Sequence, residues 1–128
     1  AFSCYIWNMR ETLEIVEVLK KVRPETLIIL GGPEVSFAGE DVLKDNFYVD
    51  YIIHGEGEET LKELLLAIRD KSEIKDIEGI IYRSDNKVYI NPPRKLIEDL
   101  DSIPTPFDDE TRILDCFKSF TILKMTFS

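Results

Sequence analysis

The sequence predicts an α/β domain built around a parallel sheet, and two observations support this. First, short apolar runs alternate with helix-like segments over residues 2–69, which is the pattern of strand–helix–strand units. Second, two of these runs end in glycine-rich turns, one at Gly31 and Gly32 and the other at Gly55 and Gly57. Glycine allows a positive φ and close approach to a ligand, and ligands bind beyond the carboxyl ends of parallel strands. The two turns therefore predict one rim of a ligand site.

Three strands are expected in this part of the chain. Residues 2–7, 27–30 and 49–53 are dense in apolar side chains, as strands covered on both faces of a sheet are. The first run begins without preceding polar residues, so we expect that the chain starts within a sheet, just before this strand. The alternative is that this strand is the true first strand.

Three helices are expected between and after these strands. The first runs from Asn8, as N-cap, to about Val22, with Glu11 close to a capping-box position and Pro24 ending the helix. The second is short, over residues 39–44, and the third covers residues 59–69. The faces expected to be buried are Ile15, Leu19 and Val22 of the first helix, and Leu61, Leu64, Leu65 and Ile68 of the third.

After residue 71 the pattern changes to a β-hairpin and a proline-rich segment. Residues 79–83 and 87–90 flank a turn at 84–86. Four prolines over residues 92–106 then indicate an extended linker. We therefore divide the chain into an α/β part (residues 1–75), the hairpin and linker (76–107), and a tail of unknown role (108–128).

Composition excludes several classes of function. A chain of 128 residues suffices for one core. The net charge of −9 argues against nucleic-acid binding, and no apolar run approaches the roughly 20 residues of a membrane span. Cys4 and Cys116 lie far apart and are interpreted as free thiols of a reducing compartment, the cytoplasm, although a disulfide stays open.

No catalytic set is visible in the sequence. We find no Ser-His-Asp arrangement, no paired carboxylates placed across a cleft and no phosphate-binding Walker loop. His54 is the single histidine, and it fits a polar strand-end residue better than a metal ligand. By themselves the residues indicate a ligand-binding α/β module, which leaves open a nucleotide, a flavin or a purely structural docking role.

Four segments carry a resemblance to a known family. These are FSCYIWN at residues 2–8, GGPEVS at 31–36, DYIIHGEGEETLKELL at 50–65 and NPPRKLIEDLDSIPTPF at 91–107. In this order they resemble the amino-terminal cobalamin-binding domain of cobalamin-dependent radical S-adenosylmethionine enzymes, the class described as methyltransferases. The resemblance covers residues 2–107 and implies a flavodoxin-like, Rossmann-like sheet that is incomplete at its N-terminus and carries a C-terminal hairpin.

The resemblance also implies which residues contact the cofactor. Ser3 would line the pocket for the nucleotide tail of cobalamin, with Tyr5 where the family has leucine, and the two glycine turns would let the tail pass. The implied cofactor-binding residues are Ser3, Tyr5, Gly31, Gly32, Pro33, Glu34, Gly55, Glu56, Gly57 and Glu58. Each has a plainer alternative: an ordinary strand-to-helix turn, a solvated helix start, a strand hydroxyl or, for Tyr5 and Trp7, a core or subunit contact.

Two departures from the family pattern limit what this chain can do. The Asp-x-His-x-x-Gly motif of the lower cobalt ligand would lie before Ala1, and the Cys-x-x-x-Cys-x-x-Cys motif that binds an iron–sulfur cluster is absent. S-adenosylmethionine and a 4Fe-4S cluster would then belong to a radical domain of the same polypeptide, and the fragment itself would be inactive. In a sheet of order 2-1-3-4-5, residues 2–7 would be the third strand. Without the first two strands they would form an exposed edge, which predicts a homodimer through that strand.

Overall fold

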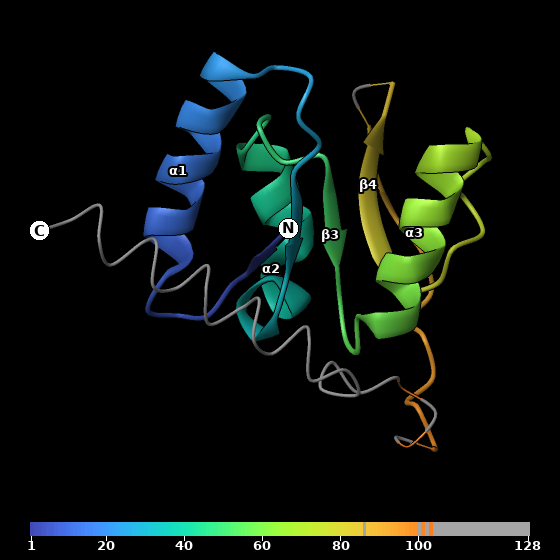
Figure 1. Cartoon of the computed structure of the whole chain (residues 1–128). Coiled ribbons are helices and arrows are strands. Elements are labelled where there is room, and N and C mark those ends of the chain that lie inside the picture. The colour runs from blue at the N-terminus through green and yellow to red at the C-terminus, as the bar shows by residue number, and fades with distance from the viewer. Residues whose placement is uncertain (86, 100, 102, 104–128) are drawn as a thin grey trace, which may run out of the picture. The chain divides into compact units, whose positions relative to one another are not determined.

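Within the residues that the structure describes, five strands form one mixed sheet with three helices packed against it (Figure 1). The elements in chain order are β1 (Phe2–Ser3), α1 (Met9–Val22), β2 (Ile29–Gly31), α2 (Pro33–Asp45), β3 (Tyr51–Ile53), α3 (Glu58–Asp70), β4 (Ile80–Ser84) and β5 (Lys87–Ile90).

The computed structural model describes residues 1–85, 87–99, 101 and 103. Residues 1–96 form one compact unit, which holds all of these elements. Residues 97–128 form a second unit, in which the backbone N–H of Asp101 donates to the Asp99 carboxylate at 3.1 Å. The predicted tail at residues 108–128 and Cys116 lie outside the described residues.

The strand order explains where a ligand site can form. The sheet runs β1-β2-β3-β4-β5, with β1 to β3 parallel and both β4 and β5 antiparallel to their neighbours. The carboxyl ends of β1, β2 and β3 therefore share one edge with the start of β4 and the end of β5. The predicted α/β architecture and the hairpin are confirmed, and the hairpin extends the same sheet.

Alternation along the strands divides the core into two layers. Leu30 and Ile52 point to the face covered by α1 and α2, whereas Ile29 and Ile53 point to the face covered by α3 (Figure 1). Successive side chains of a strand alternate between faces, so both sides of the central strands are apolar. This is why the strands appear in the sequence as continuous apolar runs.

The first strand is shorter than predicted. Only Phe2–Ser3 pairs with β2, and residues 6–8 form a turn. The Asn8 side chain explains this, because its Oδ1 accepts from the Tyr5 backbone N–H at 2.7 Å and its Nδ2 donates to the Ser3 carbonyl at 3.0 Å. Asn8 is the N-cap residue of α1, but its side chain makes no hydrogen bond to the helix, so the predicted capping box is wrong.

The predicted buried face of α1 is also partly wrong. Ile15 and Val22 are 55% and 74% exposed, while Thr12 and Val16 are buried. Leu19 does pack against the core, as predicted. The helix carries two apolar stripes, and contact with the sheet selects the stripe that contains Val16.

The other two helices show smaller differences. Helix α2 starts at Pro33 rather than at residue 39, because a proline is tolerated in the first turn of a helix. On α3, Leu64 is fully buried and Leu61 and Ile68 pack against the core, as predicted. Leu65 is 51% exposed, against the prediction.

Candidate functional site

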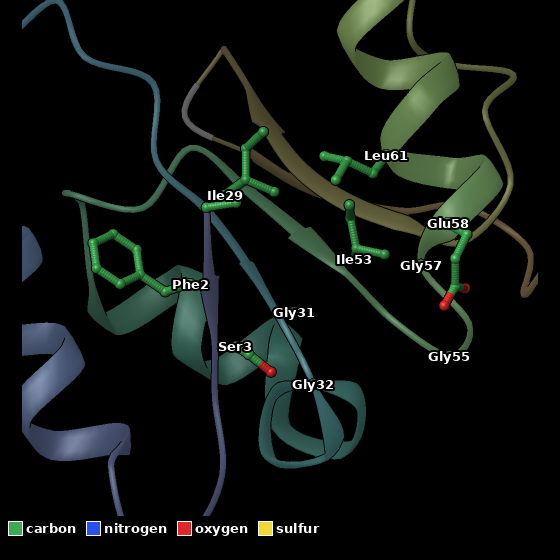
Figure 2. Close-up of a pocket in the computed structure, with 11 residues that line it drawn as sticks. Phe2, Ser3, Ile29, Gly31, Gly32, Ile53, Gly55, Gly57, Glu58 and Leu61 are labelled. Atoms are coloured by element: carbon green, nitrogen blue, oxygen red, sulfur yellow. The ribbon is translucent and has the colours of Figure 1, made fainter. Parts of the chain in front are cut away.

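A pocket of about 340 Å³ lies at the carboxyl ends of β1, β2 and β3 (Figure 2). Because these strands are parallel, the residues that follow them converge at this edge. The lining residues are Ala1, Phe2, Ser3, Ile29, Gly31, Gly32, Ile53, Gly55, Gly57, Glu58 and Leu61. The prediction that Ser3 and both glycine turns share one edge of the sheet is confirmed.

The pocket has an apolar wall and a polar rim. Figure 2 shows Ile29, Ile53 and Leu61 on the side of the sheet that faces α3. The Ser3 hydroxyl and the Glu58 carboxylate lie toward the glycine loops at the rim. The three apolar side chains were not among the predicted site residues, although strand alternation, which places Ile29 and Ile53 on one face, could have found them.

Four of the predicted site residues do not line this pocket. Tyr5, Pro33, Glu34 and Glu56 are absent from its wall. Tyr5 instead stacks on Trp7, with ring centroids 4.7 Å apart and planes at 8°. Tyr5 is 37% and Trp7 72% exposed, so neither is a core residue; their contact with a cofactor or a second subunit stays a prediction.

The two glycines of the first turn differ in what surrounds them. Gly32 has φ +105°, and a Cβ there would lie 2.6 Å from the carbonyl oxygen and 2.9 Å from the nitrogen of Cys4. The chain after β1 thus occupies the place of a side chain at Gly32. At Gly31 a Cβ would meet only the Ile53 carbonyl oxygen, at 3.9 Å. Gly31 therefore leaves space at the pocket wall, whereas Gly32 is required by the fold.

The second turn also has one glycine with open space beside it and one with a close neighbour. Gly55 has φ +79°, and a Cβ at this residue would have no neighbouring atom within 4 Å, so Gly55 faces open space. At Gly57 a Cβ would lie 3.2 Å from Cγ2 of Ile53. Within this turn, open space for a ligand is found beside Gly55.

Ser36 connects the two glycine turns. Its hydroxyl donates to the Gly32 carbonyl at 2.9 Å and accepts from the Gly55 backbone N–H at 3.2 Å. Ser36 was not among the predicted site residues, although it belongs to the GGPEVS segment. Its position one helical turn after Gly32 is the sequence signal that could have found it.

The electrostatics of the rim combine two helix starts with an acidic side chain. Helices α2 and α3 begin beside the pocket with Gly32 and Gly57 as N-caps, and neither cap provides a side-chain hydrogen bond. Helix starts favour negative groups, whereas the Glu58 carboxylate disfavours them. A phosphate at this rim would therefore meet the backbone N–H groups at the start of α3 rather than those of α2, where Pro33 has no N–H and the Glu34 N–H donates to the Cys4 carbonyl at 3.3 Å.

Cys4 and His54 carry the thiol and the imidazole among the described residues. Cys4 is a free, buried cysteine whose backbone N–H donates to the Gly31 carbonyl at 2.7 Å, and burial raises the pKa of its thiol. The Nε2 atom of His54 is buried without a hydrogen-bond partner among the described residues, and His54 does not line the pocket. The described part of the chain contains no cluster of three or more metal-ligating side chains.

The site lies in the segment that is shared with known proteins. The family model of the B12 binding domain matches residues 1–65, which include both glycine turns. This chain belongs to the B12-binding domain family. The family match favours the cobalamin interpretation over the nucleotide or flavin alternative.

Two relatives of this B12-binding domain are much longer than the chain. An uncharacterized methyltransferase of Pyrococcus horikoshii is 35% identical over 79% of this chain, which spans 22% of that protein. The cobalamin-dependent radical SAM methyltransferase TokK of Streptomyces tokunonensis is 31% identical over 84% of the chain, which spans 16% of TokK. The chain thus corresponds to about a fifth of these relatives.

Solved structures show the same fold. The cobalamin-dependent S-adenosylmethionine radical enzyme OxsB, with aqua-cobalamin and S-adenosylmethionine bound, has a TM-score of 0.63 at 20% identity over 73% of this chain and 13% of its own. The radical S-adenosylmethionine methyltransferase TsrM of Kitasatospora setae, with cobalamin and a [4Fe-4S] cluster bound, has a TM-score of 0.58 at 25% identity, covering 73% of this chain and 16% of its own. Among the described helices of this B12-binding domain, none is long and apolar enough to cross a membrane.

Proposed function

We propose that this chain binds cobalamin and is the cobalamin-binding module of a longer radical S-adenosylmethionine methyltransferase-type polypeptide. The observation that carries the proposal is the convergence of Ser3, Gly31 and the Gly55 turn on one pocket, inside the segment that matches the B12-binding family. When bound, cobalamin would supply the methyl-transfer chemistry, and the protein would bind and orient it.

The residues of the pocket fit the nucleotide tail of cobalamin. A volume of about 340 Å³ lies at the lower end of small-ligand sites and suits the tail rather than a whole corrinoid. Ile29, Ile53 and Leu61 offer an apolar wall to the flat base of the tail, and the Ser3 hydroxyl offers a hydrogen bond. Gly31 and Gly55 leave the space that such a tail needs.

The remaining predicted contacts belong to the same proposal. Gly57 and Glu58 line the pocket and would contact the tail directly, with backbone N–H groups bonding its phosphate. We keep Pro33, Glu34 and Glu56 as contacts of those parts of cobalamin that extend beyond the pocket. Tyr5 is kept for the same reason, because its exposed ring lies just after β1.

The catalytic chemistry would lie outside this chain. The sequence lacks the cysteine triplet for an iron–sulfur cluster, and this chain matches only 22% and 16% of the length of the two relatives. We therefore assign S-adenosylmethionine and the 4Fe-4S cluster to a radical domain that follows the proline-rich segment. A cytoplasmic location is inferred with it, since the free, buried Cys4 suits a reducing compartment.

Reconstitution with hydroxocobalamin tests the proposal. The full-length protein should retain a corrinoid absorbance spectrum after gel filtration, and Ser3→Ala should weaken the retention, whereas Glu40→Gln, on the surface of α2, should not. Retention of a flavin spectrum would replace cobalamin by the flavin alternative. Retention of no cofactor would favour a structural docking domain.

We also infer that the isolated chain self-associates through its first strand. Strand β1 is an edge of the described sheet, and the neighbouring Ile6 and Trp7 are 80% and 72% exposed. Edge strands with apolar neighbours pair readily with another chain. Sedimentation at micromolar concentration should show a dimer that Trp7→Lys dissociates; a monomer at all concentrations would contradict the inference.

A further inference from the structure

The chain leaves the sheet at the same edge as the pocket. Ile90, the last residue of β5, pairs with Ile81, so β5 ends beside the start of β4, at the edge of the sheet where β3 also has its carboxyl end. The pairing continues beyond β5: the Asn91 backbone N–H donates to the Ile80 carbonyl at 3.0 Å, and the Gly79 N–H donates to the Pro92 carbonyl at 2.8 Å. We call residues 91–94 the exit segment.

The exit segment is held by its first side chain. Asn91 is 8% exposed, and its Nδ2 donates to the carbonyls of Ile74 and Ile77 at 3.2 and 2.7 Å. These bonds tie the exit segment to the loop between α3 and β4. This part of the proline-rich region is therefore anchored to the unit formed by residues 1–96.

Arg94 connects the exit segment to the helix that borders the pocket. Its Nε donates to the Thr60 hydroxyl at 2.9 Å, and its Nη2 pairs with the Glu63 carboxylate. The Arg94 side chain is only 18% exposed, so solvent screens this pair less than an ordinary surface pair. Both partners lie on α3, whose residues Glu58 and Leu61 line the pocket.

Thr60 places this contact next to the pocket wall, because it lies between Glu58 and Leu61 in the first turn of α3. It is fully buried, and its hydroxyl, while accepting from Arg94, donates to the Glu78 carbonyl at 3.0 Å. The adjacent Gly79 has φ +77°, and a Cβ there would lie 2.9 Å from the Thr60 hydroxyl and 3.6 Å from Cβ of Arg94. Tight packing leaves little freedom for the exit segment to move without moving the start of α3.

We propose that Arg94 is a positioning residue that fixes the exit segment against the helix bordering the pocket, so that filling the pocket and orienting the following part of the polypeptide are coupled. The coupling rests on the proposed function, since cobalamin is the ligand that would fill the pocket; the anchor itself does not. A cofactor held at one edge of the sheet must face the domain that uses it, and an anchored exit on that edge restricts where this domain can lie.

Hydrogen exchange on the full-length protein tests the anchor without any cofactor. Arg94→Ala should accelerate exchange in peptides covering residues 87–99 by about tenfold, the loss expected for a hydrogen bond to a charged group. The matched control is Lys62→Ala, which removes a cation from α3 that pairs with Glu59 at the surface and should leave exchange unchanged. Glu63→Gln, at a half-exposed position, should also accelerate exchange in residues 87–99. It tests the anchor if Arg94→Ala does not fold.

Added hydroxocobalamin tests the coupling. In the wild type it should protect the peptides covering residues 55–61 and those covering residues 87–99, whereas in Arg94→Ala it should protect residues 55–61 alone. Equal exchange of the exit segment in Arg94→Ala and wild type without cofactor would overturn the anchor, and equal protection by cobalamin in both would overturn the coupling. If cobalamin protects neither segment in any variant, the proposed function and the coupling fail together, and the cofactor-free comparison still decides the anchor.

Discussion

Replacing Gly32 by alanine should lower the free energy of unfolding far more than the same replacement at Gly31. At Gly32 the new Cβ would lie 2.6 Å from the carbonyl oxygen of Cys4, and φ is +105°. With ψ at 174°, Gly32 lies in an extended positive-φ region where a non-glycine residue costs about 1–3 kcal/mol, and overpacking against backbone adds about 1–3 kcal/mol. The free energy of unfolding should therefore fall by about 2–6 kcal/mol.

Urea unfolding followed by circular dichroism measures this difference. Gly31→Ala is the matched control, because its Cβ would approach only the Ile53 carbonyl oxygen, at 3.9 Å, and the change in stability should stay within about 1 kcal/mol. The Gly32 effect should be the same with and without cobalamin, because its cause lies in the contact with Cys4. If Gly32→Ala unfolds at the same urea concentration as the wild type, the interpretation that this contact requires glycine is refuted.

Three further predictions concern the pocket, a thiol and an ion pair. Gly31→Val should weaken hydroxocobalamin binding by tenfold or more, about 1.4 kcal/mol, because its side chain enters the pocket; unchanged affinity in an absorbance titration would show that no ligand approaches there. Burial raises the pKa of the Cys4 thiol, so on raising the pH this thiol loses its proton in the unfolded state before it does so in the folded state. The free energy of unfolding should therefore be constant below about pH 8.5 and fall above it by up to about 1.4 kcal/mol per pH unit. A Cys4→Ala variant with the same alkaline decline would refute this. Asp50→Asn should lower the free energy of unfolding by about 1–2 kcal/mol, because the Asp50 carboxylate pairs with Lys20 at 2.8 Å and accepts from the Ile28 N–H at 2.7 Å; a wild-type urea midpoint would show that this cluster contributes nothing.

The architecture could be predicted because its signals are local. The apolar runs around Ile29 and Ile52 are long enough to mark buried strands, and the glycines after them mark the strand ends. Parallel strands place their carboxyl ends together whatever side chains they carry, so the shared edge of Ser3, Gly31 and Gly55 followed from the order of the elements. The four segments that resemble the cobalamin-binding domain then indicated which ligand this edge would bind.

Details that depend on three-dimensional contact could not be predicted in this way. Helix α1 has two apolar stripes of similar strength, and only docking on the sheet decides that Val16 is buried while Ile15 stays exposed. Asn8 was expected to cap that helix, but the chain after β1 turns back so closely that its side chain bonds Ser3 and Tyr5 instead. In both cases the sequence allows two arrangements, and the tertiary contacts select one of them.

By itself, then, the sequence determined the order of strands and helices, the edge at which a ligand can bind and the family to which the chain belongs, since these follow from periodicity, turn residues and motif order. Only the tertiary structure decided that a side chain at Gly32 would meet the backbone of Cys4, whereas one at Gly31 would have room beside the pocket. It likewise decided that Arg94, 34 residues after Thr60, is bonded to the helix that borders the pocket. The physical reason is the same in both cases: whether an atom has room or a partner depends on segments that are distant in the chain, and local sequence carries no record of them.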